Sequence, residues 1–248
     1  MDYLHAPNSF NPNFPNPFSN DGTYSGYSCF SNTGTASIDL LTRRTKSGCW
    51  LVQYNERNYV EHLVDFIKYE NSYGRVVILH SNIKINIDEC VLASEKALIP
   101  DILVHSTSLE SLNQIKIDNK LKSGSNRHEL KQQRGHTIIK YLSEEPGEYS
   151  DYVMLGTINE NTELIMAMIQ NDSFDVSEID LYKAGARIYL NAQKLHKSGL
   201  LVRDGVHAGK VFKEIDLNKY CLKIVSAEDF EHSNQWTPKN FKDACISR

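Results

Sequence analysis

The amino-acid sequence predicts an α+β protein built on a largely antiparallel β-sheet. Expected strands outnumber long helices, and several follow one another with only a turn between them, as in residues 200–203, 210–212 and 220–225. Parallel strands need a crossover of about a dozen residues or more, whereas antiparallel strands need only a short turn. The short connections therefore favour a mixed fold with an antiparallel sheet over a doubly wound parallel fold.

Residues 1–38 are expected to form an irregular arm. They are rich in Asn, Pro, Ser and Gly and contain four of the seven prolines of the chain, a composition that opposes regular structure. Between residues 10 and 30 they also contain six aromatic side chains, too many for a freely solvated tail. We therefore expect the rings of this arm to pack onto the body of the protein or onto a partner.

Residues 39–100 are expected to form a small α/β region. Residues 49–54 have the composition of a strand, residues 59–67 place apolar side chains at helical spacing, and residues 75–80 form a second apolar strand. Such a β-α-β unit is either a small domain or the first layer of a single fold, because only Ile99-Pro100-Asp101 separates it from the second half of the chain.

Residues 101–248 are expected to form the main domain. Its first strand, residues 102–104, leads directly into a helix that starts near Ser108 and places Leu109, Leu112 and Ile115 on one face. A long polar loop is expected over residues 122–137. The remaining predicted elements are strands at 152–155, 186–190 and 220–225, helices at 163–169 and 192–197, and a β-ribbon formed by 200–203 and 210–212.

Composition excludes several classes of protein. With 40% hydrophobic and 23% charged residues, the chain has an ordinary globular composition, and no apolar run approaches the roughly 20 residues of a membrane span. The N-terminus lacks the basic and apolar regions of a secretory signal. The five cysteines are scattered without C-x-x-C spacing. We therefore expect neither structural zinc nor a disulfide scaffold, no membrane partner, and a cytoplasmic location.

The charge distribution along the chain is uneven. Residues 116–140 contain seven Lys or Arg against two acids, whereas residues 141–180 contain no Lys or Arg and ten acids. A basic loop of this kind can hold a phosphate-bearing acceptor, or it can be a solvated loop balanced by its acidic neighbour. The candidate acceptor-binding residues are Arg127, His128, Arg134 and His136.

The most informative segment is residues 104–115, where a strand delivers His105, Ser106 and Thr107 to the start of a helix. A helix N-terminus attracts anions, and an imidazole and a hydroxyl can bind sugar hydroxyl groups, so this arrangement suits a ribose and a pyrophosphate. The alternative is a polar strand end at which Thr107 or Ser108 only caps the helix.

The second half of the chain resembles the ADP-ribosyltransferase superfamily. Residues 104–112 are similar to the His-Gly-Thr opening of tRNA 2′-phosphotransferases, and residues 188–206 are similar to the later part of that family. Asp151-Tyr152-Val153-Met154-Leu155 is similar to a strand of DarT-like DNA ADP-ribosyltransferases, and Asp204-Gly205-Val206-His207-Ala208 is similar to another of their segments. The matches follow the family order over roughly residues 101–226.

The resemblance implies an ADP-ribosyltransferase-like split antiparallel sheet with NAD as cofactor. It places His105, Ser106 and Thr107 in the NAD site, with Ser106 where the family has glycine. Arg203 would hold a phosphate, or else pair with Asp204 or a neighbouring strand. Tyr152 would stack on nicotinamide, or else be a tyrosine at the edge of the core. These two residues are the catalytic candidates.

Two parts of the family pattern have no certain equivalent in this sequence. Residues 1–100 do not match the winged-helix half of the phosphotransferases, which supplies an Arg-His pair. The catalytic glutamate of the DNA- and protein-modifying members is unassigned, although Glu228 and Glu231 lie in the corresponding C-terminal region.

The expected function is therefore transfer of ADP-ribose from NAD to an RNA, a DNA or a nucleotide-like acceptor. The alternative within the superfamily is a toxin or effector that modifies a protein. The alternative from another class is a non-catalytic nucleotide sensor or a protein-interaction module that uses the aromatic arm.

Overall fold

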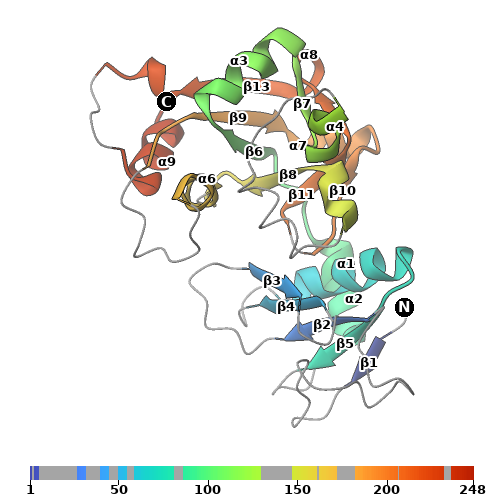
Figure 1. Cartoon of the computed structure of the whole chain (residues 1–248). Helices are drawn as coiled ribbons and strands as arrows, with labels where there is room; N and C mark the ends of the chain where they lie inside the picture. Colours follow the sequence, from blue (N-terminus) through green and yellow to red (C-terminus); the bar gives the residue numbers. More distant parts are fainter. Residues whose placement is uncertain are drawn as a thin grey trace. The chain divides into compact units, whose positions relative to one another are not determined.

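The chain folds into two compact units in a computed structural model (Figure 1). One unit comprises Met1–Leu98, Leu142–Gly147 and Arg203–His207, and the other comprises Ile99–Tyr141, Glu148–Val202 and Ala208–Arg248. The structure describes residues 1, 3–5, 27–31, 40–44, 50–54, 59–80, 86–129, 147–160, 162–171, 182–205, 207–231 and 236–248.

The N-terminal unit contains a five-stranded sheet in the order β1-β5-β2-β4-β3. Strands β1, β5, β2 and β4 run parallel to one another, and β3 is antiparallel to β4. The elements of this unit are β1 (Tyr3–His5), β2 (Tyr27–Ser31), β3 (Leu40–Arg44), β4 (Trp50–Tyr54), α1 (Tyr59–Ser72), β5 (Val76–His80) and α2 (Ile87–Lys96).

Helix α1 supplies much of the described core of this unit. Leu63, Val64 and Ile67 are fully buried on its inner face, as are Val77 and Leu79 on β5. The expected strands at 49–54 and 75–80 and the helix between them are therefore present. Residues 3–5 and 27–31 differ from the expectation of an irregular arm, because they form β1 and β2 of the sheet; residues 2, 6–26 and 32–38 lie outside the described part.

The C-terminal unit contains a six-stranded sheet in the order β10-β11-β8-β6-β9-β13, in which every neighbouring pair is antiparallel. The first elements of this unit are β6 (Ile102–Thr107), α3 (Leu109–Asp118), β7 (Lys120–Lys122), α4 (Gly124–Glu129), the short helix η1 (Gly147–Asp151), β8 (Tyr152–Thr157) and α6 (Thr162–Asn171). The remaining elements are β9 (Ala186–Asn191), α7 (Ala192–Lys197), β10 (Leu201–Val202), β11 (Gly209–Phe212), β12 (Glu214–Asp216), α8 (Leu217–Tyr220), β13 (Cys221–Ser226), the short helix η3 (Ala227–Asp229) and α9 (Pro238–Ile246). The expected α+β class with a mostly antiparallel sheet is thus confirmed.

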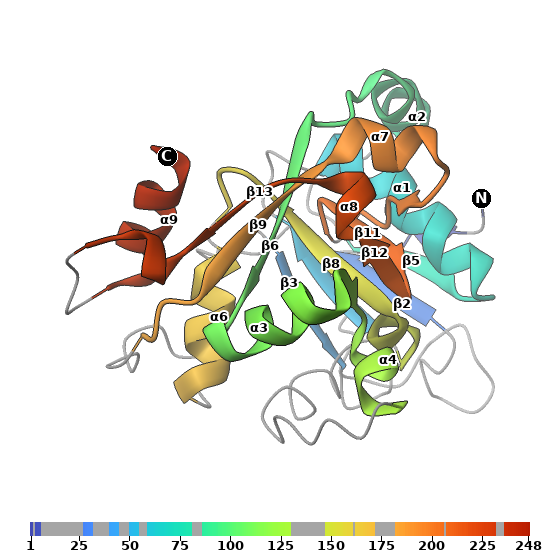
Figure 2. The same ribbon diagram turned by 90° about the horizontal axis from the view of Figure 1, so that it is seen from above.

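The six-stranded sheet separates two buried clusters, because successive side chains of a strand point to opposite faces. Ile188 and Leu190 of β9 pack with apolar side chains of α3, α7 and α8, whereas Tyr189 packs with Phe241 and Cys245 of α9. Helices α6 and α9 lie side by side in both views (Figures 1 and 2). This alternation decides which residues of β6 can share a site.

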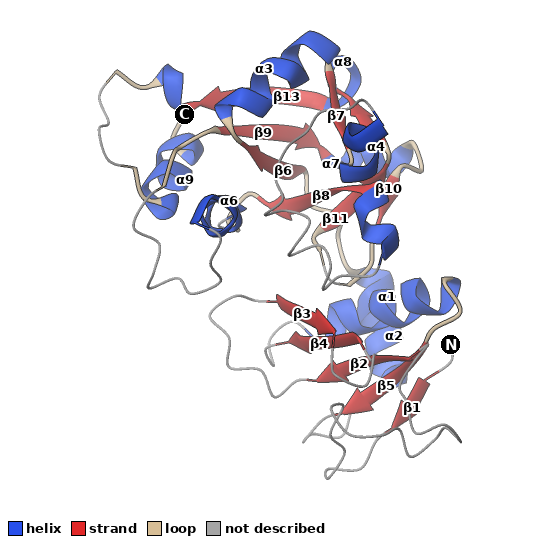
Figure 3. Ribbon diagram, in the orientation of Figure 1, coloured by secondary structure: helices blue, strands red, loops and turns tan. Residues whose placement is uncertain are grey.

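Short elements account for most of the differences from the predicted pattern (Figure 3). The expected polar loop at 122–137 begins as helix α4, and residues 130–137 lie outside the described part. Helix α9 was not expected, although Thr237 caps it and Pro238 occupies its first turn. Strands β7 and β12 pair with each other in a separate two-stranded ribbon. Among the described helices, none is long and apolar enough to cross a membrane.

Candidate functional site

His105 lies on β6 near the middle of the six-stranded sheet. Its Nδ1 is 3.0 Å from the carbonyl oxygen of Met154 on the neighbouring β8. Because a carbonyl oxygen can only accept, Nδ1 carries a proton and donates, which makes Nε2 the acceptor whenever the ring is neutral. The contact with β8 therefore fixes both the orientation and the tautomer of this imidazole.

The helix that follows β6 is α3, and Ser108 is its N-cap. The Ser108 hydroxyl accepts a hydrogen bond of 3.1 Å from the backbone N–H of Ser111. The predicted helix start is confirmed, and Ser108 has the capping role that the sequence offered as the alternative to ligand binding. Thr107 is only 6% exposed, and Gly185 lies so close that an added Cβ would stand 1.9 Å from the Thr107 carbonyl oxygen.

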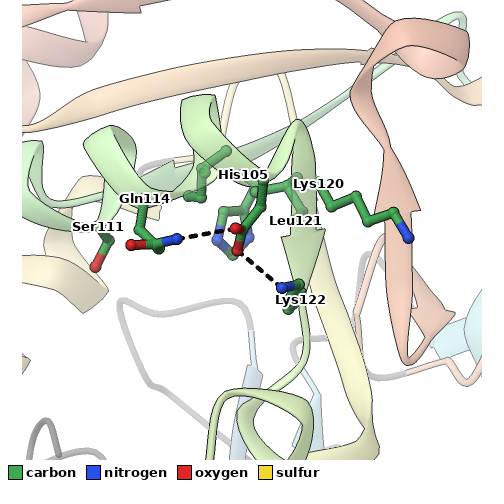
Figure 4. A pocket seen from close by; sticks show the side chains of 8 residues that line it. His105, Ser111, Gln114, Lys120, Leu121 and Lys122 are labelled. Atoms are coloured by element: carbon green, nitrogen blue, oxygen red, sulfur yellow. Dashed lines mark hydrogen bonds and ion pairs between the residues drawn. The ribbon is translucent and has the colours of Figure 1, made fainter. Parts of the chain in front are cut away.

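A solvent-open depression, the His105 hollow, lies between β6, α3 and β7 (Figure 4). The cavity itself measures about 40 Å³, and the empty space among its side chains is about 410 Å³ when the part open to solvent is included. Most of the lining side chains are polar, and two are apolar. The lining residues are His105, Ser111, Gln114, Ile115, Asp118, Lys120, Leu121 and Lys122.

The charged groups of the His105 hollow are paired with one another. Asp118 accepts from Gln114 Nε2 at 2.9 Å and from Lys122 Nζ at 2.8 Å, and the hydrogen bond from Lys122 lowers the pKa of Asp118 (Figure 4). Lys120 Nζ is 2.6 Å from Glu214 Oε1 on β12, and this hydrogen bond raises the pKa of Lys120. Each of the two lysines therefore already has a carboxylate partner.

Ser106 faces the opposite side of the sheet from His105. Its hydroxyl donates to Glu163 Oε1 at 2.6 Å and is also 2.6 Å from the Thr162 hydroxyl. Glu163 in turn pairs with Arg187 Nη1 at 3.1 Å, and both charged side chains are fully buried. The structure therefore separates Ser106 from the hollow that His105 lines, although the sequence grouped them in one cofactor site.

Tyr152 belongs to a different cluster, which contains the buried Lys210. The Lys210 Nζ lies 4.5 Å from the centroid of the Tyr152 ring and 3.7 Å from that of Tyr149, distances at which a cation is attracted to an aromatic face. The Tyr152 ring also packs edge-on against Phe212. Lys210 and Tyr149 were missed in the sequence analysis, where Lys210 was counted only as part of an apolar β-ribbon.

Arg203 belongs to the N-terminal unit, whereas His105 belongs to the C-terminal unit. Its Nη2 is 2.5 Å from Asp65 Oδ2 on α1, so its ion pair is not with Asp204. The neighbouring Asp204 is fully buried and accepts from the backbone N–H and Nδ1 of His207 at 2.8 and 3.2 Å.

Gly205 follows in the left-handed region with a φ of 73°, and an added Cβ would lie 2.3 Å from the His62 carbonyl oxygen, so a larger residue does not fit at this position.

The acceptor-binding candidates fall largely beyond what the structure describes. Arg134 and His136 lie outside the described residues, and Arg127 and His128 lie on α4 but without described side chains. Glu228 and Glu231, the candidate catalytic glutamates, are both exposed near the end of β13. No cluster of His, Cys, Asp and Glu that could hold a metal occurs among the described residues.

Fold and site together define an α+β protein with a polar depression beside the central strand of an antiparallel sheet. Comparison of the chain with protein-family models, with curated proteins and with solved structures found no match. The resemblance to ADP-ribosyltransferases therefore rests on the short motifs of this sequence alone.

Proposed function

We propose that the C-terminal unit is an NAD-dependent ADP-ribosyl-transferring domain that acts on a nucleic-acid or nucleotide-like acceptor. The observation that carries this proposal is the position of His105, whose ring is oriented by Met154 and lines a hollow with Ser111, Gln114 and Asp118. An ordered histidine among hydroxyl, amide and carboxylate groups suits a ligand rich in hydroxyl groups. The ordered series of family-like motifs across residues 101–226 adds support.

The chemistry places modest demands on the protein. Cleavage of the nicotinamide–ribose bond passes through a transition state that resembles an oxocarbenium ion, so catalysis depends on orienting NAD and stabilising positive charge on the ribose. In this proposal His105 binds a sugar hydroxyl through Nε2. The basic segment that contains Arg127, His128, Arg134 and His136 binds the acceptor.

The two catalytic candidates from the sequence, Arg203 and Tyr152, have no catalytic role in this proposal. The guanidinium of Arg203 is paired with Asp65, and the ring of Tyr152 packs against Phe212 beside the Lys210 ammonium group. These contacts give both side chains structural roles. We therefore assign neither of them to the His105 hollow.

The test is nicotinamide release from NAD by the full-length protein. The reaction is run with NAD alone, with DNA, with 2′-phosphorylated RNA and with a protein extract. We expect release that depends on a nucleic-acid acceptor. Dependence on protein alone would instead identify a protein-modifying toxin or effector, and NAD binding without release would identify a sensor.

Two substitutions of His105 separate its ligand contact from its structural contact. An asparagine side chain can place an N–H donor near the position of Nδ1, so His105→Asn keeps a donor for the Met154 carbonyl but lacks Nε2. His105→Gln places its amide nearer to the position of Nε2. We expect His105→Asn to lower the release rate by about tenfold or more, as for the loss of one hydrogen bond, with unchanged thermal stability.

The matched control is His196→Ala, which removes an exposed imidazole from the last turn of α7. Its release rate should equal that of the unmodified protein. Equal activity in His105→Asn and His196→Ala, or no release with any acceptor and no stabilisation by NAD, would contradict the proposed function.

A further inference from the structure

Among the described side chains that line the His105 hollow, Asp118 is the acidic group, and it stands at the end of α3. Its two carboxylate oxygens are held separately, Oδ1 by Gln114 and Oδ2 by Lys122 (Figure 4). A carboxylate offers about four lone-pair sites, so these contacts leave acceptor capacity on both oxygens. The side chain is 21% exposed and can therefore be reached from the hollow.

The pairing of charges in the hollow restricts the kind of ligand that it can take. Lys122 is neutralised by Asp118 at 2.8 Å, and Lys120 is neutralised by Glu214 at 2.6 Å. A phosphate placed beside Asp118 would meet a negative carboxylate and would have to displace it from Lys122. A neutral group that donates two hydrogen bonds would instead leave both ion pairs in place.

We propose that Asp118 is the acceptor for the two vicinal hydroxyl groups of a ribose, and that it thereby makes the His105 hollow selective for NAD over NADP. A cis-diol presents two O–H donors side by side, which matches the two oxygens of one carboxylate. NADP differs from NAD by a phosphate on the 2′-oxygen of the ribose next to adenine, so this is the ribose whose hydroxyl groups Asp118 accepts in the proposal. Asp118 is thus a specificity-determining residue, and this inference rests on the proposed function.

Gln114 and Lys122 are the positioning residues for this carboxylate. They hold it from two sides, so that little rotational freedom is lost when a sugar binds. Hydrogen bonds from hydroxyl groups to an ionised carboxylate are stronger than those between neutral groups.

The experiment measures binding of NAD, NADP, ADP-ribose and 2′-phosphorylated ADP-ribose to the full-length protein by calorimetry. Asp118→Asn removes the charge and one acceptor while keeping the shape of the side chain. We expect it to weaken NAD and ADP-ribose binding by about tenfold to a hundredfold, the effect of losing a charge-assisted hydrogen bond, and to reduce the preference for NAD over NADP.

The matched control is Asp243→Asn on α9 of the same unit. Asp243 forms the same kind of pair with Lys239, four residues away and at the same 2.8 Å, but it does not line the hollow. Its substitution should leave all four affinities unchanged. A shared effect of the two substitutions would indicate altered stability rather than a lost ligand contact and would overturn the proposal.

The outcomes separate this inference from the proposed function. Equal affinity for NAD and NADP, or NAD binding that is unchanged in Asp118→Asn, would overturn the role of Asp118 even if nicotinamide release were observed. Binding of ADP-ribose that depends on Asp118, without release of nicotinamide, would support the ribose site and contradict the transferase activity. Absence of binding by all four nucleotides would overturn both.

Discussion

His105 and Ser106 are adjacent in the chain, yet they contribute to different parts of the C-terminal unit. His105 lines a solvent-open hollow, whereas Ser106 joins the buried pair of Glu163 and Arg187. Arg187 Nη2 also donates to the carbonyl oxygens of Ile158 at 2.6 Å and Glu160 at 3.2 Å. At the scale of single residues, the buried pair therefore connects β9, α6 and the turn that follows β8.

The buried pair leads to a stability prediction. Arg187→Met leaves the Glu163 carboxylate buried without its cation, so we expect it to lower the free energy of unfolding by about 3–5 kcal/mol. The double variant Arg187→Met/Glu163→Leu removes both charges and should be more stable than Arg187→Met alone. Urea denaturation followed by circular dichroism measures both changes.

The exposed pair of Lys239 and Asp243 provides the comparison. Lys239→Met should leave the free energy of unfolding almost unchanged, because solvent screens this exposed pair. If Arg187→Met were as mild as Lys239→Met, the buried pair would not have the structural role assigned to it.

At the scale of elements, the connection from β6 to α3 positions the candidate site. Ser108 caps α3, and Asn119 ends it in the left-handed conformation with a φ of 54°. The chain then turns into β7, so that Asp118 and Lys122 come together across a single turn. The hollow therefore depends on where α3 begins and ends rather than on a long loop.

Loss of the cap should destabilise this element. Ser108→Ala removes the acceptor for the Ser111 N–H, and we expect it to lower the free energy of unfolding by about 1 kcal/mol. Ser108→Asp retains an acceptor at the helix N-terminus and should restore the stability. Ser247→Ala, at the exposed C-terminal end of α9, is the control. If Ser108→Ala left the stability unchanged but weakened NAD binding, the Ser108 hydroxyl would be a ligand-binding group rather than a helix cap.

At the scale of the whole molecule, the chain forms two units with separate sheets, one mostly parallel and one antiparallel. The segment Arg203–His207 lies between β10 and β11 in sequence, yet it belongs to the N-terminal unit. The sequence analysis divided the chain near residue 100, close to the boundary between Leu98 and Ile99. It did not include Arg203–His207 in the N-terminal region. A fragment that starts at residue 99 would thus retain Arg203 without Asp65.

The C-terminal unit should lose stability at alkaline pH. Burial raises the pKa of Tyr189 to about 12 and that of Cys245 to about 12, and burial also raises the pKa of Tyr182. Because these pKa values are higher in the folded state, the unfolded chain releases its protons first as the pH rises. The stability from these groups is complete below about pH 9 and decreases as the pH approaches 12.

Urea denaturation at pH 8 and at pH 10.5, followed by Trp236 fluorescence in a Trp50→Phe background, measures this decrease. Trp236 packs against Phe230 and Phe241 beside these groups. Tyr189→Phe removes one of the three ionisations and should lessen the pH dependence, whereas the exposed Tyr73→Phe should not change it. A free energy of unfolding that stays constant between the two pH values would contradict the prediction.

The predictable parts of the fold are those with strong local patterns. The apolar runs of β4, β5, β8, β9 and β13 indicated strands, and Ser108 indicated the start of α3. Strands β1 and β2 were missed because they are short and lie among proline- and asparagine-rich residues, so their pairing with β5 depends on contacts distant in sequence. Helix α4 was missed because its residues Gly124–Glu129 are polar and show no apolar periodicity.

The candidate site was predictable only in part. The sequence by itself determined that a strand would deliver His105 to the start of a helix, because both elements follow from local patterns of apolar and capping residues. Only the tertiary structure decided that Asp118 and Lys122 share a hollow with His105, that Ser106 faces Glu163, and that Arg203 pairs with Asp65. The physical reason is that the face of a strand and the register of its neighbours bring together residues that no local pattern connects.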